Sequence, residues 1–207
     1  MSAAETRQRL IDHARIAFAA KGHDNVSLQR DILKPAGISN GSFYHQFQDK
    51  TDLLVAVLED GRERARGVVE GALAASPDAP RAERMQQRLQ LWLVVIEHGE
   101  AMIRIQVRER DNNDERVRAL LADFRTGSFA PLAKRLATSV APDSETFDPE
   151  RAALFVQEFV QSVAINYLDM PQEQRTAQRE DIARDMTAFI IGGVSNMAGI
   201  THNAEAK

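Results

Sequence analysis

Residues 31–54 read DILKPAGISNGSFYHQFQDKTDLL, and this stretch decides the fold. Proline disfavours helical geometry in the residue before it, so Pro35 predicts that the helix preceding it ends near Lys34. Gly37 then supplies a tight turn, and Ser39 has a side chain that can cap a second short helix. The stretch therefore predicts a helix, a turn and a helix, the geometry that lays one helix in the major groove of DNA while its partner braces it.

Two residues beyond this turn are placed where helix stability alone does not explain them. Gly41 costs a helix about 1 kcal/mol relative to alanine, a cost that close approach of its backbone to another surface would explain. Lys50 lies in the first turn of the next helix, where a cation opposes the helix dipole unless a phosphate binds there. The second short helix has an apolar side and a hydrogen-bonding side, made by Ile38, Phe43 and Phe47 and by Asn40, Ser42, Tyr44 and His45 respectively. Two short helices with a glycine turn also occur in folds that do not bind DNA, so this pattern leaves both interpretations open.

The remaining hydrophobic periodicity is helical nearly throughout and predicts an all-α protein. A first helix begins with the capping-box pair Ser2 and Glu5 and ends at Lys21 before Gly22. Residues 103–107 alternate like a strand, but no second strand is nearby to pair with them, so we interpret this segment as helix. The other predicted helices are a short one capped by Ser27, one from Ser39 to about His45 or Phe47, one from Asp49, and those over about 81–97, 113–138, 149–169 and 173–199.

The charge is distributed unevenly along the chain. Its 207 residues carry a net charge of −4, but residues 1–50 hold seven Lys and Arg against five Asp and Glu. A basic N-terminal part on an acidic body is expected where only that part meets phosphates. The chain has no cysteine, no signal-peptide pattern at its N-terminus, and no apolar run longer than the six residues 91–96. We therefore expect a cytoplasmic protein that does not enter a membrane.

The sequence around the turn resembles the TetR family of transcriptional regulators. That family's signature runs apolar-Ser-x-Gly-Thr/Ser-Leu/Phe-Tyr-x-x-Phe, followed by Lys and a Leu-rich helix. Residues 38–47, ISNGSFYHQF, match it, and Lys50 and Leu53-Leu54 follow. Further matches are Asp31-Ile32, Ala36-Gly37, and Phe18 with Lys21-Gly22 after it. The clear resemblance covers about residues 6–58.

The resemblance implies a transcriptional regulator, a repressor released by a small-molecule effector, that binds a palindromic double-stranded DNA operator as a homodimer. It implies a three-helix helix-turn-helix domain over residues 1–48 and a larger helical domain for effector binding and dimerisation over residues 49–207. The implied base-edge readers are Gln29, Asn40 and Ser42, and the implied phosphate contacts are Ser39, Gly41, Tyr44, His45 and Lys50. Arg30 completes the predicted DNA-binding set. Two features depart from the family, namely Leu33-Lys34-Pro35 in place of small residues and a Ser27-to-Gly37 spacing one residue longer than usual, so the face presented by Gln29 and Arg30 stays open.

The C-terminal helices carry the expected dimer surface. Apolar residues recur along both, namely Phe155, Phe159, Val163 and Tyr167 on one and Ile182, Met186, Phe189, Gly193 and Met197 on the other. The alternative is that these stripes form ordinary intramolecular core. The central helices offer candidates for an effector pocket, because six residues place polar or bulky groups near apolar runs: Trp92, His98, Met102, Arg104, Phe124 and Asn166.

Two other classes of protein compete with a DNA-binding regulator. A helical di-metal enzyme would need Glu-x-x-His pairs on facing helices, and none of the five histidines has a glutamate three residues before it. His-Glu-x-x-His, Gly-x-Ser-x-Gly and phosphate-binding glycine motifs are absent as well, so we expect no enzyme, no metal site and no cofactor. The second class, a helical adaptor that binds only protein and has no DNA affinity, stays open as the alternative.

Overall fold

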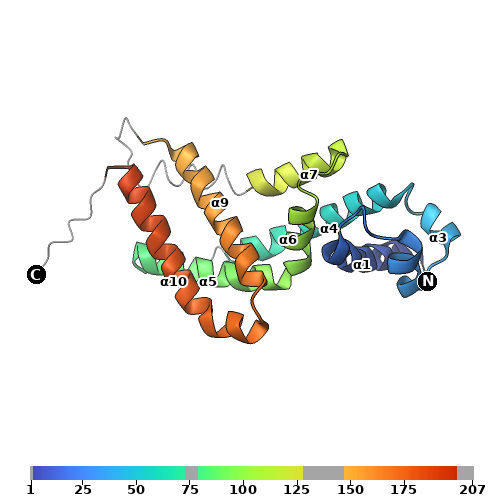
Figure 1. Cartoon of the computed structure of the whole chain (residues 1–207), viewed down its shortest axis with the longest axis horizontal. Helices are drawn as coiled ribbons and strands as arrows, with labels where there is room; N and C mark the ends of the chain where they lie inside the picture. The colour runs from blue at the N-terminus through green and yellow to red at the C-terminus, as the bar shows by residue number, and fades with distance from the viewer. Residues whose placement is uncertain (1, 73–78, 128–146, 200–207) are drawn as a thin grey trace, which may run out of the picture. The chain divides into compact units, whose positions relative to one another are not determined.

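The computed structural model describes residues 2–72, 79–127 and 147–199, and every regular element in these ranges is helical (Figure 1). The chain forms two compact units, one of residues 1–69 and 99–124 and the other of residues 70–98 and 125–207. The elements are α1 (Ala3–Lys21), η1 (Leu28–Leu33), α2 (Lys34–Ala36), α3 (Asn40–Tyr44), α4 (Lys50–Ala72), α5 (Arg81–His98), α6 (Glu100–Arg108), α7 (Glu115–Thr126), α9 (Pro149–Leu168) and α10 (Gln172–Met197). The predicted all-α class is confirmed.

The first helix has the ends that its sequence predicts. The Ser2 hydroxyl accepts the Glu5 amide at 3.2 Å, and the Glu5 carboxylate accepts the Ser2 amide at 2.7 Å, which completes a capping box. Gly22 ends α1 with φ at 76°, a left-handed value that glycine adopts without steric cost. The segment 103–107, which alternates like a strand, lies inside α6 and is helical as predicted.

The helix before the turn differs from its prediction. Ser27 caps it as expected, but its helical turns continue through Pro35 to Ala36 rather than ending near Lys34. Residues 28–33 form a π-helix, in which Lys34 donates to the Gln29 carbonyl five residues back. A π turn accommodates one extra residue and widens the helix, so that the proline ring avoids the carbonyl that an α-helix would press against it. The longer spacing between Ser27 and Gly37 is absorbed in this way.

The first unit closes one core around α1, η1, α2, α3, the start of α4, α6 and α7. Phe18, Phe43 and Leu58 are fully buried in it, and Ile105 and Val117 bring α6 and α7 to the same core. The third predicted helix ends at Tyr44, slightly before the predicted limit, and Gly37 makes the turn with φ at 65°. These contacts join residues 99–124 to the N-terminal helices, so the compact units do not follow the predicted boundary after residue 48, which stays a prediction about function.

The second unit packs α10 against α5 and α9. Tyr167 is 1% exposed and donates its hydroxyl to Glu97, which also receives two hydrogen bonds of 3.0 Å from Arg179. Burial alone would raise the pKa of the Glu97 carboxyl, but the hydrogen bonds from Tyr167 and Arg179 outweigh it and the pKa is lowered. Burial, together with the Glu97 contact, raises the pKa of Tyr167. Both groups therefore keep their hydrogen-bonded forms at neutral pH.

Two residues of the predicted dimer surface belong to this core. Tyr167 and Met186 are buried within the unit, where Tyr167 ties α9 to α5 and α10, so their assignment to an exposed surface is wrong. When a helix packs against a neighbour, only part of a wide apolar stripe on its surface stays exposed.

Part of the predicted 113–138 helix, beyond residue 127, lies outside the described residues. In the described ranges, each helix is too short or too polar to span a bilayer.

Candidate nucleic-acid interface

The helix after the turn presents a continuous polar surface. Ile38, Phe43 and Phe47 are buried, and they anchor α3 against the first unit. Six of the seven residues between them are exposed, namely Ser39, Asn40, Gly41, Ser42, Tyr44 and His45, and Gln46 is half-buried. All six are predicted DNA contacts, and the fold brings them to the surface of one short helix. The apolar side and the hydrogen-bonding side that the sequence predicts are both present.

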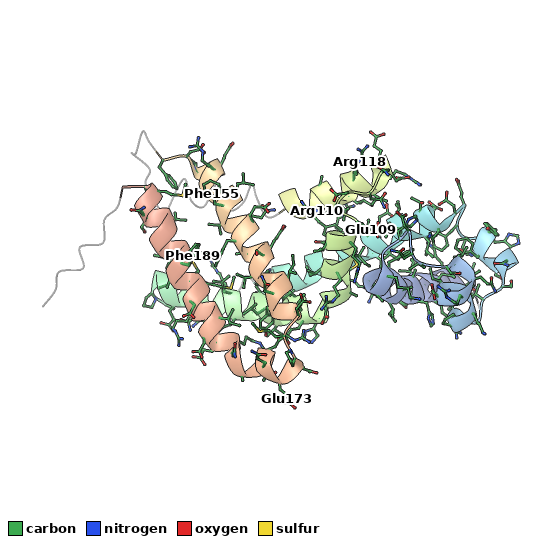
Figure 2. All side chains as sticks on the ribbon, in the orientation of Figure 1. Glu109, Arg110, Arg118, Phe155, Glu173 and Phe189 are labelled. Atoms are coloured by element: carbon green, nitrogen blue, oxygen red, sulfur yellow. The ribbon has the colours of Figure 1, made fainter. Side chains whose placement is uncertain are left out.

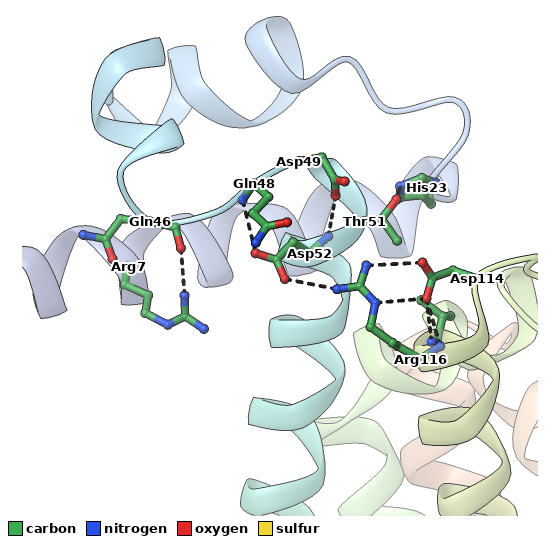
Figure 3. A network of polar contacts seen from close by, with 10 residues as sticks. Arg7, His23, Gln46, Gln48, Asp49, Thr51, Asp52, Asp114 and Arg116 are labelled. Carbon is green, nitrogen blue, oxygen red and sulfur yellow. Dashed lines mark hydrogen bonds and ion pairs between the residues drawn. The ribbon is translucent and has the colours of Figure 1, made fainter.

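Side chains around α3 hold it in place without covering this surface. Arg7 of α1 lies with its guanidinium 4.4 Å from the centre of the Phe47 ring and donates to the Gln46 carbonyl at 3.3 Å (Figure 3). The Ser39 hydroxyl accepts the Ser42 amide at 3.2 Å and caps the helix start. Arg7 is not among the predicted site residues, because it lies 39 positions before Gln46 and the sequence gives no signal of a contact formed only by folding.

Gly41 is not required by the packing of the chain itself. A Cβ built there would meet only the Ser39 hydroxyl, at 4.0 Å, and its backbone does not have a positive φ. Asn40 and His45 make no side-chain hydrogen bond within the described residues, so their side chains are available to a partner. A glycine with open space in front of it, between available polar groups, suits the close approach of another molecule.

Lys50 has a structural role that the sequence does not reveal. Its ammonium group donates to the carbonyls of His23 and Val26, the latter at 2.9 Å, and so ties α4 to the loop between α1 and η1. The Thr51 hydroxyl lies 3.2 Å from Nε2 of His23 and strengthens the same connection. These carbonyls explain a cation in the first turn of α4 without any phosphate, although an ammonium group has a third N–H to offer.

The start of α4 is organised by carboxylates that face a basic residue from α7. Asp49 accepts the Asp52 amide at 2.8 Å, and Asp52 accepts the Gln48 amide at 3.2 Å (Figure 3). Arg116 reaches Asp52 at 3.4 Å and Asp114 at 3.2 Å. The hydrogen bond from Arg116 is the main reason that the pKa of the Asp114 carboxyl is lowered. This network fixes the N-terminal turn of α4 beside α3.

The end of α6 holds the loop that precedes η1. Arg108 donates from Nε to the Ala19 carbonyl at 2.9 Å, near the end of α1. Glu109 is 5% exposed and accepts the His23 amide at 2.6 Å and the Asn112 side-chain amide at 2.8 Å. Glu109 therefore fixes the same loop that Lys50 binds, while Arg108 fixes the end of α1 before it, and neither contact is predicted from the sequence.

The two predicted contacts before the turn are both at the surface. Gln29 and Arg30 are exposed on η1, and their part in DNA binding stays a prediction. Arg30 does not extend freely, because Nε and Nη2 donate to the two carboxylate oxygens of Asp31 at 2.9 and 3.0 Å. The predicted DNA-binding residues thus lie on η1, on α3 with its two cap residues, and at the start of α4, and Lys50 is the most enclosed of them.

The predicted effector residues are divided between the two units. Trp92 and His98 lie on α5 and Asn166 on α9, where His98 and Asn166 pair with backbone carbonyls of their own helices at 2.8 Å. The other three belong to the first unit: Met102 packs beside Gly61, Arg104 pairs with Glu100, and Phe124 packs on the core. Their role as an effector site stays a prediction.

The second unit has an exposed apolar face on α9 and α10 (Figure 2). Phe155 and Phe189 are 56% and 63% exposed, and the ring of Phe189 stacks on Phe159 with centroids 4.4 Å apart. A cavity of about 490 Å³ opens between them. Its lining is entirely apolar or glycine, namely Ala152, Phe155, Val156, Phe159, Phe189, Ile190, Gly193, Val194 and Met197. Large exposed aromatic side chains around an apolar hollow are typical of a protein–protein contact.

The helical segment of η1 and α2, the glycine turn and the short polar helix α3 together form a helix-turn-helix of the kind that binds DNA. Residues 10–57 match the family model described as bacterial regulatory proteins, tetR family. This part of the chain is a helix-turn-helix domain of the type found in the TetR family of transcriptional regulators. A repressor of Mycobacterium tuberculosis, Rv1474c, is 32% identical over 77 residues, 36% of this chain and 41% of the relative. The regulator BetI of Klebsiella pneumoniae is 34% identical over 80 residues, 39% of this chain and 40% of the relative.

Solved structures extend the likeness in fold to nearly the whole chain. A TetR family regulator from Chloroflexus aurantiacus superposes with a TM-score of 0.69 at 20% identity, over 95% of this chain and 93% of the other. The fatty acid degradation regulator FadR of Bacillus halodurans superposes with a TM-score of 0.67 at 16% identity, over 91% and 95%. The sequence matches span only about two fifths of the curated relatives' length and lie around the helix-turn-helix.

Proposed function

We propose that this protein represses transcription by binding a palindromic DNA operator as a homodimer, and that a small-molecule effector releases it. The observation that carries the proposal is the exposed surface of α3, where Asn40, Tyr44 and His45 surround a glycine that the fold does not need. Hydrogen-bonding side chains on one short helix suit the edges of base pairs in the major groove. Such a protein acts where the DNA lies, which in a bacterium is the cytoplasm.

A salt titration of binding to random duplex DNA tests this proposal against the adaptor alternative. A DNA-binding protein releases counterions from the phosphates, so the logarithm of its affinity should fall linearly with the logarithm of the salt concentration. The titration is followed by fluorescence anisotropy of a labelled duplex. An adaptor that recognises only protein shows no affinity for the duplex even at low salt, and that result contradicts the proposal.

The apolar face of α9 and α10 supports the homodimer. A short operator half-site rarely supplies enough affinity, so proteins of this class pair across two half-sites. Phe155 and Phe189 leave large aromatic surface in water, and a second copy of the same face would cover it by two-fold symmetry. A Cβ added at Gly192 or Gly193 would meet nothing within 4 Å in the described part of the chain, so a neighbouring helix can approach α10 closely there.

Replacement of Lys50 by alanine is expected to weaken binding to all DNA sequences to a similar degree. The loss has two causes, because the ammonium group both holds the loop carbonyls of His23 and Val26 and has one N–H left for a phosphate. The slope of affinity against salt should become less steep by about one unit. An unchanged slope, measured on the same duplex, would show that Lys50 acts only within the protein.

Replacement of Asn40 by alanine is expected to relax sequence preference at particular operator positions. The side chain is exposed and makes no hydrogen bond within the described residues, so its loss removes no contact of the fold. A base-edge contact accounts for about 1–3 kcal/mol of discrimination. Affinities for a panel of single-base operator variants measure this, and Asn40 is no base reader if every variant is penalised as before.

The effector stays the least specified part of the proposal. FadR of Bacillus halodurans is described as a regulator of fatty acid degradation, and this chain shares its fold at 16% identity, which does not carry a ligand over. We infer that the binding residues lie on the central helices, with Trp92 as the partly buried aromatic candidate on α5. Thermal shift of the protein against a library of small apolar and aromatic molecules, followed by release of bound DNA, would identify the effector.

A further inference from the structure

Asp31 collects an unusual set of donors at the start of η1. Its side chain is only 10% exposed, and its carboxylate accepts the Ser27 amide at 2.9 Å and the Lys21 ammonium at 2.8 Å. The same carboxylate receives Nε and Nη2 of Arg30 at 2.9 and 3.0 Å, a bidentate pair between sequence neighbours. The carboxylate is thus anchored by Lys21 at the end of α1 and by the N-cap residue of η1, in addition to its pair with Arg30.

The return of the Asp31 side chain to the helix start explains why these neighbours can pair. Adjacent residues on a helix normally point in different directions and do not meet. Here the Asp31 side chain folds back over the helix start to the Ser27 amide, four residues earlier, while the Ser27 hydroxyl accepts the Arg30 amide at 3.4 Å. The hydrogen bond from Arg30, followed by that from Lys21, holds the pKa of the Asp31 carboxyl well below its usual range. The carboxylate is therefore charged at any pH at which the protein would act.

The pairing leaves a defined edge of the guanidinium free. Arg30 has five N–H donors in a rigid plane, and Asp31 occupies the edge made by Nε and Nη2. The side chain is 69% exposed, and Nη1 makes no hydrogen bond in the described part of the chain. The remaining edge presents Nη1 and Nη2 with two parallel N–H groups. Guanine offers the matching acceptors, N7 and O6, side by side in the major groove.

We propose that Arg30 reads a guanine in each operator half-site through its Nη1–Nη2 edge, and that Asp31 is the positioning residue that holds this edge toward the DNA. The assignment rests on the proposed function, since it requires that the helix-turn-helix binds duplex DNA. A guanidinium held at one edge loses less conformational freedom on binding than a free one, so the contact favours one base rather than any phosphate within reach.

The experiment compares the unsubstituted protein with Arg30→Ala, Arg30→Lys and Asp31→Asn. A selected operator is changed to each other base at every guanine of the half-site, and affinities are measured by anisotropy. The unsubstituted protein should prefer guanine at one position by about 10-fold or more. Arg30→Ala and Arg30→Lys should lose that preference and keep the others, because lysine has no bidentate edge. Asp31→Asn should reduce it severalfold, although asparagine can still accept the Ser27 amide.

Lys21→Ala is the matched control, because it removes another cation from the same carboxylate and leaves the Arg30 pair in place. It should keep the guanine preference. Equal weakening on every sequence by Arg30→Ala would identify a phosphate contact and overturn the assignment, while DNA binding itself stands. Full preference in a folded Asp31→Asn protein would overturn the positioning role. Absence of DNA binding by the unsubstituted protein would instead overturn the proposed function and the assignment with it.

Discussion

Replacement of Phe189 by aspartate is expected to convert the proposed homodimer into a folded monomer. Phe189 is 63% exposed and stacks on Phe159 beside the apolar cavity, so a charge there would be buried against the second copy. Truncation of a central interface aromatic commonly costs about 2 kcal/mol or more, roughly a 30-fold weakening, and two-fold symmetry places the substitution twice in one interface. Sedimentation equilibrium measures the mass directly, and operator affinity should fall with it.

Ile16→Asp provides the control for this prediction. Ile16 is 68% exposed on α1, so the substitution places the same charge on an equally exposed apolar side chain outside the proposed interface. The Ile16 variant should keep the mass of a dimer. A Phe189→Asp protein that stays dimeric at the same concentration would show that the face of α9 and α10 is not where the copies meet.

Replacement of Phe43 by alanine is expected to lower the free energy of unfolding by about 3–5 kcal/mol, the cost of removing a fully buried phenyl group. Phe43 is 0% exposed and packs edge to face with Tyr44 and beside Phe47. Tyr44→Ala should cost only about 0.5–1.5 kcal/mol, the worth of one aromatic pair, because Tyr44 is 63% exposed. Urea denaturation, followed by circular dichroism, measures both.

Tyr44 should matter more for DNA binding than for stability. Tyr44→Ala is expected to weaken operator binding by about 10-fold, since its hydroxyl is proposed to contact a phosphate and one such contact contributes of order 1.4 kcal/mol. Tyr44→Phe keeps the ring and loses the hydroxyl, so it should lose affinity and keep stability. Unchanged operator affinity in both Tyr44 variants would remove Tyr44 from the interface.

The sequence predicts the parts of this protein that depend on neighbouring residues. Ser2 and Glu5 form their capping box, Ser39 caps α3, and the exposed side of α3 carries the residues expected there. Such features follow from backbone geometry and helix periodicity, which operate over a few residues. The class of protein can also be predicted, because the motif shared with the TetR family lies within one short stretch of sequence around α3.

The sequence does not predict contacts between residues that are distant along the chain. Lys50 meets the carbonyls of His23 and Val26, and Glu109 meets the His23 amide from 86 residues away. Tyr167 belongs to an apolar stripe in the sequence, but its hydroxyl donates a hydrogen bond to Glu97 of the same unit. Nothing in helix periodicity tells which side of a stripe meets its own core and which is left for a partner.

The pairing of Arg30 with Asp31 falls between these two cases. The extra residue between Ser27 and Gly37 is visible in the sequence, but only the structure shows that a π-helix absorbs it. The Asp31 carboxylate lies back over the helix start, and Gln29 and Arg30 lie at the surface. The edge of Arg30 that is free for DNA therefore depends on side-chain contacts that only the structure shows.

Selection of bound duplexes from a random DNA library tests most directly whether this protein reads DNA as a symmetric dimer. We expect an enriched inverted repeat, with half-site centres about 10–10.5 base pairs or a multiple apart, as a symmetric dimer with two recognition helices requires. The symmetry of the site reports the dimer, and its base preferences report α3 and η1. Recovery of no enriched sequence, or of a single site without an inverted repeat, would contradict this expectation.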